Sequence, residues 1–131
     1  MNPTTQVLEE RLSAIEGGVA ALGVSSGSSA IALAIQNVAS SSDNIVASPH
    51  LYGGTYNLFT NTLRQMGIEV RFADPANPEN FADISDEKTR AYFGETLPNP
   101  HLVPFPIAEV AEIGRKRAIP LIVDNTAAPL T

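Results

Sequence analysis

The sequence contains no cysteine and no tryptophan, and it has only two histidines among 131 residues. Disulfides, thiolate metal sites and a cysteine nucleophile are therefore excluded, and a histidine-based metal site is not expected. Basic residues are also few, because eight Lys and Arg stand against fourteen Asp and Glu, which gives a net charge of -6. Nucleic-acid binding depends on clustered basic side chains, so the sequence predicts no nucleic-acid partner.

Long apolar runs are missing as well. No stretch approaches the roughly 20 residues that a membrane-spanning helix needs, and the N-terminus lacks the basic and then apolar layout of a signal peptide. These features predict a cytoplasmic protein with no membrane association. The chain is nevertheless 44% hydrophobic, which suffices for one buried core, so we expect one domain or a piece of one.

Short apolar runs alternate along the chain with longer stretches of helical periodicity. Such alternation indicates βαβ units with right-handed crossovers, hence a mainly parallel sheet with helices on both faces. The predicted fold class is therefore α/β. Strands are expected at 19–24, 45–47, 67–72, 90–93 and 119–124, and helices at 3–16, 30–39, 52–66, shortly after the loop at 74–80, and at 107–117.

The run at 119–126 delivers one carboxylate, Asp124, at the end of a predicted buried strand. Open α/β sheets bind their ligands beyond the carboxyl ends of their strands, so Asp124 is a candidate ligand-facing acid. The alternative is an aspartate that only caps the turn after the strand.

A loop of small residues at 25–29 lies between a predicted strand and the start of a helix. Glycine lets the backbone approach an anion, the helix dipole favours negative charge, and serine hydroxyls add donors. The loop therefore suits a phosphate, although an ordinary turn with a helix cap is the alternative. It matches neither the GxGxxG nor the GxxxxGK[ST] pattern, which disfavours a nucleotide-binding module.

Two further features follow the strands predicted at 45–47 and 90–93. Tyr52 precedes two glycines, and its ring is suited to stack on a flat ligand, although this motif alone favours a core tyrosine. Asn99 stands between two prolines that hold it in an extended loop, with plain turn chemistry as the alternative. All four features follow strands and so converge on one edge of the sheet. Together they favour a phosphorylated, flat, basic ring such as pyridoxal phosphate.

Several short motifs occur in a specific order along nearly the whole chain. They are Met1-Asn2-Pro3-Thr4, Glu16-Gly17-Gly18, Ser26-Gly27, Tyr52-Gly53-Gly54-Thr55, Glu95-Thr96, Asn99-Pro100 and Val123-Asp124-Asn125-Thr126. In this order they resemble the cysteine/methionine-metabolism enzymes of pyridoxal-phosphate fold type I. The resemblance implies part of the large cofactor-binding domain of that fold, with pyridoxal 5'-phosphate as the cofactor.

The resemblance also implies roles for individual residues at the phosphate. Gly27 and Ser28 would donate backbone N–H groups to it, and a backbone contact tolerates Ser at a position where relatives usually have Met or Gln. Ser26 and Thr126 belong to the same cofactor-binding set.

Around the ring, the resemblance implies that Tyr52 stacks on the pyridine and moves protons as the catalytic residue. Asp124 would pair with the pyridine nitrogen and keep it protonated, because an adjacent carboxylate favours the charged form. Asn99 would contact the phenolic oxygen of the ring, and Glu95 would be a supporting residue.

The segment Tyr56-Asn57-Leu58-Phe59 is similar to the O-acetylhomoserine sulfhydrylases of the family, and Asn57 is expected next to the substrate. Cystathionine-handling relatives (γ-synthase or γ-lyase) usually have Arg in place of Asn57, and methionine γ-lyases commonly have Cys in place of Gly54. The resemblance thus implies γ-replacement, in which sulfide or a small thiol displaces acetate from O-acetyl-L-homoserine. It also implies a homodimer or homotetramer whose subunits share active sites.

The lysine that holds the cofactor in this family is not among these residues. Family members attach pyridoxal phosphate as a Schiff base to a lysine well downstream of the Asp124 strand, whereas Lys88 and Lys116 lie in other contexts. The N-terminal arm and the C-terminal domain of the family are missing too. We therefore expect residues 1–131 to be a partial cofactor-binding domain that is inactive alone. The competing hypothesis is a truncated, non-catalytic chain that acts only as a binding or association module.

Overall fold

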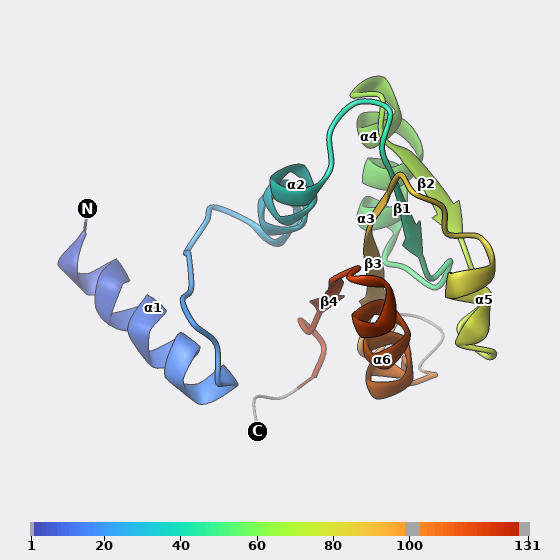
Figure 1. Ribbon diagram of the computed structural model, residues 1–131. Helices are drawn as coiled ribbons and strands as arrows, with labels where there is room; N and C mark the ends of the chain where they lie inside the picture. The colour runs from blue at the N-terminus through green and yellow to red at the C-terminus, as the bar shows by residue number, and fades with distance from the viewer. Residues whose placement is uncertain (1, 99–102, 129–131) are drawn as a thin grey trace.

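A four-stranded parallel sheet forms the centre of the computed structural model, which describes residues 2–98 and 103–128 (Figure 1). The strand order is β2-β1-β3-β4, and each neighbouring pair is parallel. The predicted α/β class with a mainly parallel sheet is confirmed. The strands are β1 (Asn44–Ala47), β2 (Glu69–Phe72), β3 (Thr89–Glu95) and β4 (Leu121–Asp124).

Helices cover both faces of the sheet, as predicted (Figure 1). Side chains of successive strand residues point to opposite faces, so the central strands are buried on both sides. In β1, Ile45 and Ala47 join one hydrophobic core, whereas Val46 joins the other. The first core receives α2 (Gly27–Val38) and the helical run α3 (Gly53–Asn57), η1 (Leu58–Thr62) and α4 (Leu63–Gln65), and the second receives α5 (Glu79–Asp83) and α6 (Ile107–Arg117).

The helix predicted at 30–39 begins three residues earlier, at Gly27, because Ser26 caps it. The Ser26 Oγ accepts a hydrogen bond from the Ser29 N–H at 3.1 Å. A serine hydroxyl that satisfies an unpaired N–H of the first turn stabilises a helix start by about 1 kcal/mol. The loop predicted at 25–29 therefore lies half inside the helix, which places the first turn of α2 at the edge of the sheet.

The strand predicted at 19–24 is wrong. In the structure this segment has no regular secondary structure, and Val19 and Leu22 are exposed. It runs beside α1 (Pro3–Glu16), where Glu9 Oε2 accepts a hydrogen bond from the Gly23 N–H at 2.7 Å. A strand needs a neighbour to satisfy its backbone groups, and within residues 2–98 and 103–128 no strand pairs with it.

The opening helix α1 stands away from the sheet (Figure 1) and has no buried residue. Its apolar side chains recur at helical spacing, as predicted, but Val7, Leu8 and Ile15 are all more than half exposed. Over the described parts of the chain, no helix is both long and apolar enough to cross a membrane.

The ring of Phe105 packs against the backbone of Gly94, near the end of β3. A Cβ at Gly94 would lie 2.5–2.7 Å from three atoms of that ring, and Phe105 is buried in the second core, edge-on to Phe81 with a centroid separation of 5.9 Å. The end of β3 therefore requires a residue without a side chain at this position.

We expect Gly94→Ala to lower the free energy of unfolding by about 1–3 kcal/mol, because the added methyl group overpacks the core. The measurement is urea unfolding followed by circular dichroism. Gly53→Ala is the matched control, since a Cβ there meets nothing within 4 Å. Equal urea midpoints for the two variants would contradict the packing constraint.

Candidate functional site

A cavity of about 380 Å³ lies where the carboxyl ends of β1, β3 and β4 meet the N-terminus of α2. The structure brings six of the predicted site residues to its lining, although they are spread over 101 positions of the sequence. These six are Ser26, Gly27, Ser28, Tyr52, Asp124 and Thr126.

The first turn of α2 forms one end of the cavity. Ser26 is extended, and its side chain and its carbonyl accept hydrogen bonds from Ser29 and Ala30, respectively. The N–H groups of Gly27 and Ser28 come before the first bonded N–H of the helix, and they are among the four that a helix leaves without an internal partner. A Cβ at Gly27 would meet nothing within 4 Å. This end can therefore receive an anion, and the first turn carries no acidic residue that would oppose it.

Asp124 lies at the end of β4 and lines the cavity. Its Oδ1 accepts a hydrogen bond from the Thr126 N–H at 3.0 Å and a short one from the Thr126 hydroxyl. Both interpretations of Asp124 therefore fit the structure: the carboxylate caps the turn after the strand, and it also lines the cavity. Thr126 fixes the orientation of the acid.

Tyr52 is 63% exposed, so the interpretation of a core tyrosine is wrong. Its ring folds back over Gly54, where a Cβ would lie 2.9 Å from the ring Cε1 and 3.3 Å from Cδ1. The second glycine after Tyr52 therefore leaves room for the ring, and any larger residue at that position would displace it. Tyr52 is thus largely exposed and lines the cavity.

Glu95 ends β3 and lies directly beside Asp124 in the register of the β3–β4 pair. Its side chain is buried, and its Oε1 accepts a hydrogen bond from the Tyr52 N–H at 2.8 Å. Burial raises the pKa of the Glu95 carboxyl above its usual value, and the negative charge of Asp124 raises it further, whereas the Tyr52 N–H acts in the opposite direction.

The loops that follow β3 and β4 are joined by a side-chain hydrogen bond. The Thr96 hydroxyl donates to Asn125 Oδ1 at 2.8 Å, and the Thr96 N–H donates to the Asp124 carbonyl at 3.0 Å. These two hydrogen bonds hold the loops side by side at the carboxyl ends of β3 and β4. They explain why motifs that lie 29 residues apart in the sequence act as one wall of the cavity.

Sequence reasoning did not assign several residues of the lining. The apolar part of the wall comes from Ile31 and Leu97, and the buried Thr55 adds a polar side chain. A helical apolar pattern predicts that Ile31 is buried, but it carries no information about which ligand the residue faces. Glu95, expected as a supporting residue, also belongs to the lining.

Two of the predicted residues are not brought to the cavity by the described structure. Asn57 lies in α3 outside the lining, and its Oδ1 accepts a hydrogen bond from Asn61 Nδ2 at 2.6 Å. Asn99 lies outside the described residues. The roles of both residues stay predictions.

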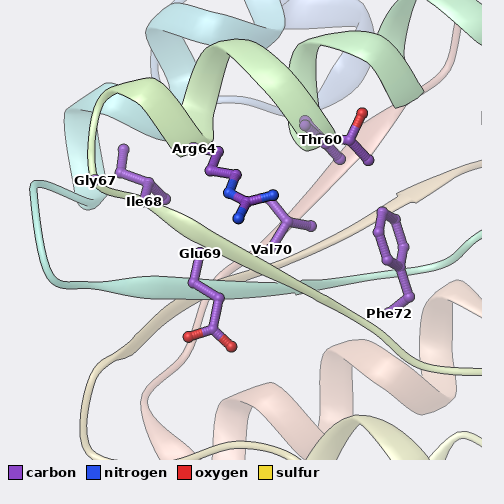
Figure 2. Close-up of a pocket in the computed structure, with 8 residues that line it drawn as sticks. Thr60, Arg64, Gly67, Ile68, Glu69, Val70 and Phe72 are labelled. Carbon is purple, nitrogen blue, oxygen red and sulfur yellow. The ribbon is translucent and has the colours of Figure 1, made fainter.

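A larger cavity, of about 470 Å³, lies beside β2, the strand at the other side of the sheet from β4. Figure 2 shows the Arg64 guanidinium extending over β2, while the Glu69 carboxylate points away from it. Glu69 instead accepts a hydrogen bond from Arg71 Nε at 2.8 Å. The residues that line this cavity include none of the predicted site residues, so size alone does not identify the functional site.

The buried Glu95 gives the stability of the protein a distinctive pH dependence. Its pKa is raised in the folded state, whereas the unfolded chain keeps about the usual 4.5. A raised pKa contributes stability below the unfolded value, and that contribution is lost as the pH rises through the folded value. Since glutamine does not titrate, we expect the stability of Glu95→Gln relative to wild type to increase as the pH rises above about 4.5.

Urea unfolding at several pH values checks this expectation. Glu112→Gln is the control, because the hydrogen bond from Arg115 lowers the pKa of that exposed carboxyl. Its contribution changes only below the usual pKa, so the difference between Glu112→Gln and wild type should stay flat over the same range. Parallel pH curves for wild type and Glu95→Gln would contradict the raised pKa.

Comparison with known proteins identifies the relatives of this chain. The family model described as Cys/Met metabolism PLP-dependent enzyme matches residues 1–130. The O-acetyl-L-homoserine sulfhydrylase of Leptospira meyeri is 52% identical over 126 residues, which are 96% of this chain and 28% of that protein. The homocysteine/cysteine synthase of Saccharomyces cerevisiae is 50% identical over 125 residues, which are 95% of this chain and 28% of that protein.

Solved structures have the same fold. An O-acetylhomoserine sulfhydrylase of Wolinella succinogenes superimposes with a TM-score of 0.93 at 37% identity, over 98% of this chain and 36% of that one. A Campylobacter jejuni structure that contains a pyridoxyl-lysine adduct gives a TM-score of 0.93 at 40% identity, over 97% of this chain and 31% of that one. The architecture is thus the predicted fold type I, and the chain spans about 28% of the length of the two curated relatives. On the family match and these identities, the chain belongs to the Cys/Met metabolism PLP-dependent enzymes.

Proposed function

We propose that this chain forms the cofactor-binding part of a pyridoxal-phosphate-dependent sulfhydrylase. The reaction is γ-replacement on O-acetyl-L-homoserine, in which sulfide or a small thiol takes the place of acetate. The observation that carries the proposal is the cavity at the strand ends, where an open helix N-terminus and a strand-ending carboxylate line the same space. Relatives that are 50–52% identical and named as a sulfhydrylase and a homocysteine/cysteine synthase support the choice of reaction.

The residues of the cavity fit pyridoxal phosphate by their chemistry. The phosphate would lie at the start of α2, where the N–H groups of Gly27 and Ser28 and the hydroxyl of Ser26 are donors. Asp124 would bind the protonated pyridine nitrogen, because an adjacent carboxylate favours the charged form of a base. When bound, the cofactor supplies an electron sink for carbanions next to the amine carbon of the substrate.

The remaining residues would orient the ring and move protons. Tyr52 offers an accessible aromatic face for stacking and a phenol as a proton carrier. Thr126 would hold Asp124 in the orientation that the ring nitrogen requires, through its two hydrogen bonds to Oδ1. Asn99 would contact the phenolic oxygen of the ring, and Asn57 would lie on the substrate side.

Residues 1–131 would then be one part of a larger cytoplasmic protein. In this proposal, the lysine that attaches the cofactor, the N-terminal arm and the C-terminal domain come from sequence outside these residues. Neither Lys88 nor Lys116 lines the cavity. The exposed apolar side chains of α1 and the half-buried edge strand β4 support further packing partners. A homodimer or homotetramer with shared active sites would supply some of them.

The first experiment treats the protein from its natural source with pyridoxal phosphate and then with borohydride, and measures its intact mass after denaturation. We expect a chain longer than 131 residues that carries one pyridoxyl group, because reduction makes the attachment to a lysine permanent. A chain of 131 residues without an adduct would instead favour the non-catalytic association module. Sulfide-dependent release of acetate from O-acetyl-L-homoserine then tests the reaction itself.

In that protein, Asp124→Asn should lower kcat by about 10- to 100-fold, which corresponds to losing a hydrogen bond to a charged group. Asparagine keeps an oxygen for the Thr126 N–H but cannot hold a positive charge on the ring nitrogen. Steady-state kinetics with O-acetyl-L-homoserine and sulfide measure the effect.

Asp74→Asn is the matched control. Asp74 Oδ1 also accepts an N–H two residues later, from Ala76 at 3.0 Å, but Asp74 does not line the cavity. Equal kcat values for both variants would argue against Asp124 as the partner of the ring nitrogen.

A further inference from the structure

Glu95 is a buried acid to which the proposed function assigns no task. It is 7% exposed, and it accepts the Tyr52 N–H at 2.8 Å across 43 residues of sequence. Burying a carboxylate is costly unless hydrogen bonds compensate for the lost water. The Tyr52 N–H offsets part of that cost, so the one hydrogen bond ties the buried Glu95 side chain to the Tyr52 backbone.

The segment between β1 and α3 explains why this hydrogen bond matters. The Ser48 N–H donates to the Phe93 carbonyl at 3.0 Å, which ties the start of the segment to β3. At its end, Tyr52 occupies the N-cap of α3 but makes no side-chain capping hydrogen bond. Glu95 therefore supplies a side-chain acceptor exactly where the backbone turns into the helix that carries the tyrosine ring.

The ring of Tyr52 has little packing of its own to fix it. Its surface is mostly exposed, and its close neighbour is Gly54, which has no side chain. The backbone at Tyr52 must therefore be held for the ring to keep its place above the cavity. Glu95 lies next to Asp124 in the β3–β4 register. The end of β3 is therefore hydrogen-bonded to the Tyr52 backbone and also adjoins Asp124.

We propose that Glu95 is a positioning residue, which holds the Tyr52 backbone so that the ring stands over the cavity at a fixed place relative to Asp124. The inference rests on the proposed function in one respect, since it takes the ligand of Tyr52 to be the flat ring of the cofactor. The hydrogen bond itself belongs to the protein and is testable without any ligand.

A pair of variants of similar shape separates the acceptor from the packing. Glu95→Gln keeps an oxygen for the Tyr52 N–H, whereas Glu95→Met fills the same space without an acceptor. Volume-conserving replacements of this kind are tolerated in cores, so both variants should fold.

The first measurement is hydrogen exchange of the Tyr52 amide in the cofactor-free protein. In Glu95→Gln we expect exchange as slow as in wild type, and in Glu95→Met we expect it to be faster by about 10-fold or more. The Ser48 amide, which donates to the Phe93 carbonyl, is the internal control and should stay protected in all three proteins. Unchanged protection of the Tyr52 amide in Glu95→Met overturns the proposal.

The second measurement is a double-mutant cycle in the cofactor-loaded protein. Glu95→Met should lower kcat/KM by about 10- to 100-fold, and it should weaken the visible circular dichroism of the bound cofactor, while Glu95→Gln keeps both close to wild type. If Glu95 acts through the Tyr52 ring, its replacement should cost only a few-fold in a Tyr52→Ala background, which removes the ring and keeps the backbone N–H. An equal loss in both backgrounds shows a role that does not pass through Tyr52 and overturns the proposal.

The two measurements keep the proposal apart from the proposed function. If the protein lacks sulfhydrylase activity but its Tyr52 amide loses protection in Glu95→Met, the positioning role of Glu95 stands and the proposed reaction is wrong. If the protein is a sulfhydrylase but hydrogen exchange of its Tyr52 amide does not change in Glu95→Met, the reaction stands and the positioning role of Glu95 is wrong.

Discussion

The pairing of β3 between β1 and β4 is the constraint on which the site depends. All but one of the seven residues of β3 are buried, so both faces of the strand are fixed by core packing. Its parallel registers place Phe93 beside Ala47 and Glu95 beside Asp124. Since parallel strands end at the same edge, the residues that follow each strand are brought together although they are far apart in the sequence. A shift by one residue in β3 would turn Glu95 to the other face of the sheet.

This constraint also explains why position after a strand was a good guide to the site. Asp124 ends one apolar run, and Tyr52 follows another. The loop at 25–29 was predicted to follow a strand at 19–24 that does not form, and it reaches the site because it starts α2. The helix predicted at 107–117 matches α6 at both ends, since its apolar face and its basic last turn are local signals. These features depend on residues within a few positions of one another, which a single sequence records.

What the sequence could not supply is set by contacts between distant residues. The apolar run at 19–24 has the composition of a strand, but pairing requires a partner, and local composition does not say whether one is present. The hydrogen bond between Glu95 and Tyr52 spans 43 residues and depends on the exact ends of two strands. The accessibility of the Tyr52 ring depends in turn on the space above Gly54, which is a property of the folded backbone.

The two acids at this edge lie in different surroundings and suit different tasks. Glu95 is buried, which raises the pKa of its carboxyl, and its Oε1 accepts the Tyr52 N–H. Asp124 is only partly buried and receives both donors of Thr126 on one oxygen. In the proposed function, a carboxylate oriented in this way would meet the cationic ring nitrogen. Neighbouring carboxyl groups with separated environments are a common way to divide such tasks.

The distance between the two ends of the cavity is set by hydrophobic packing rather than by polar contacts. Ile31 and Ile35 of α2 are buried in the core that also contains Ile45 and Phe93. Ile31 lies about one helical turn after Gly27, so the packing that holds it against the sheet also fixes the first turn of α2 relative to Asp124. Polar residues then decide which groups a ligand meets at each end, while the aliphatic side chains decide how long that ligand can be.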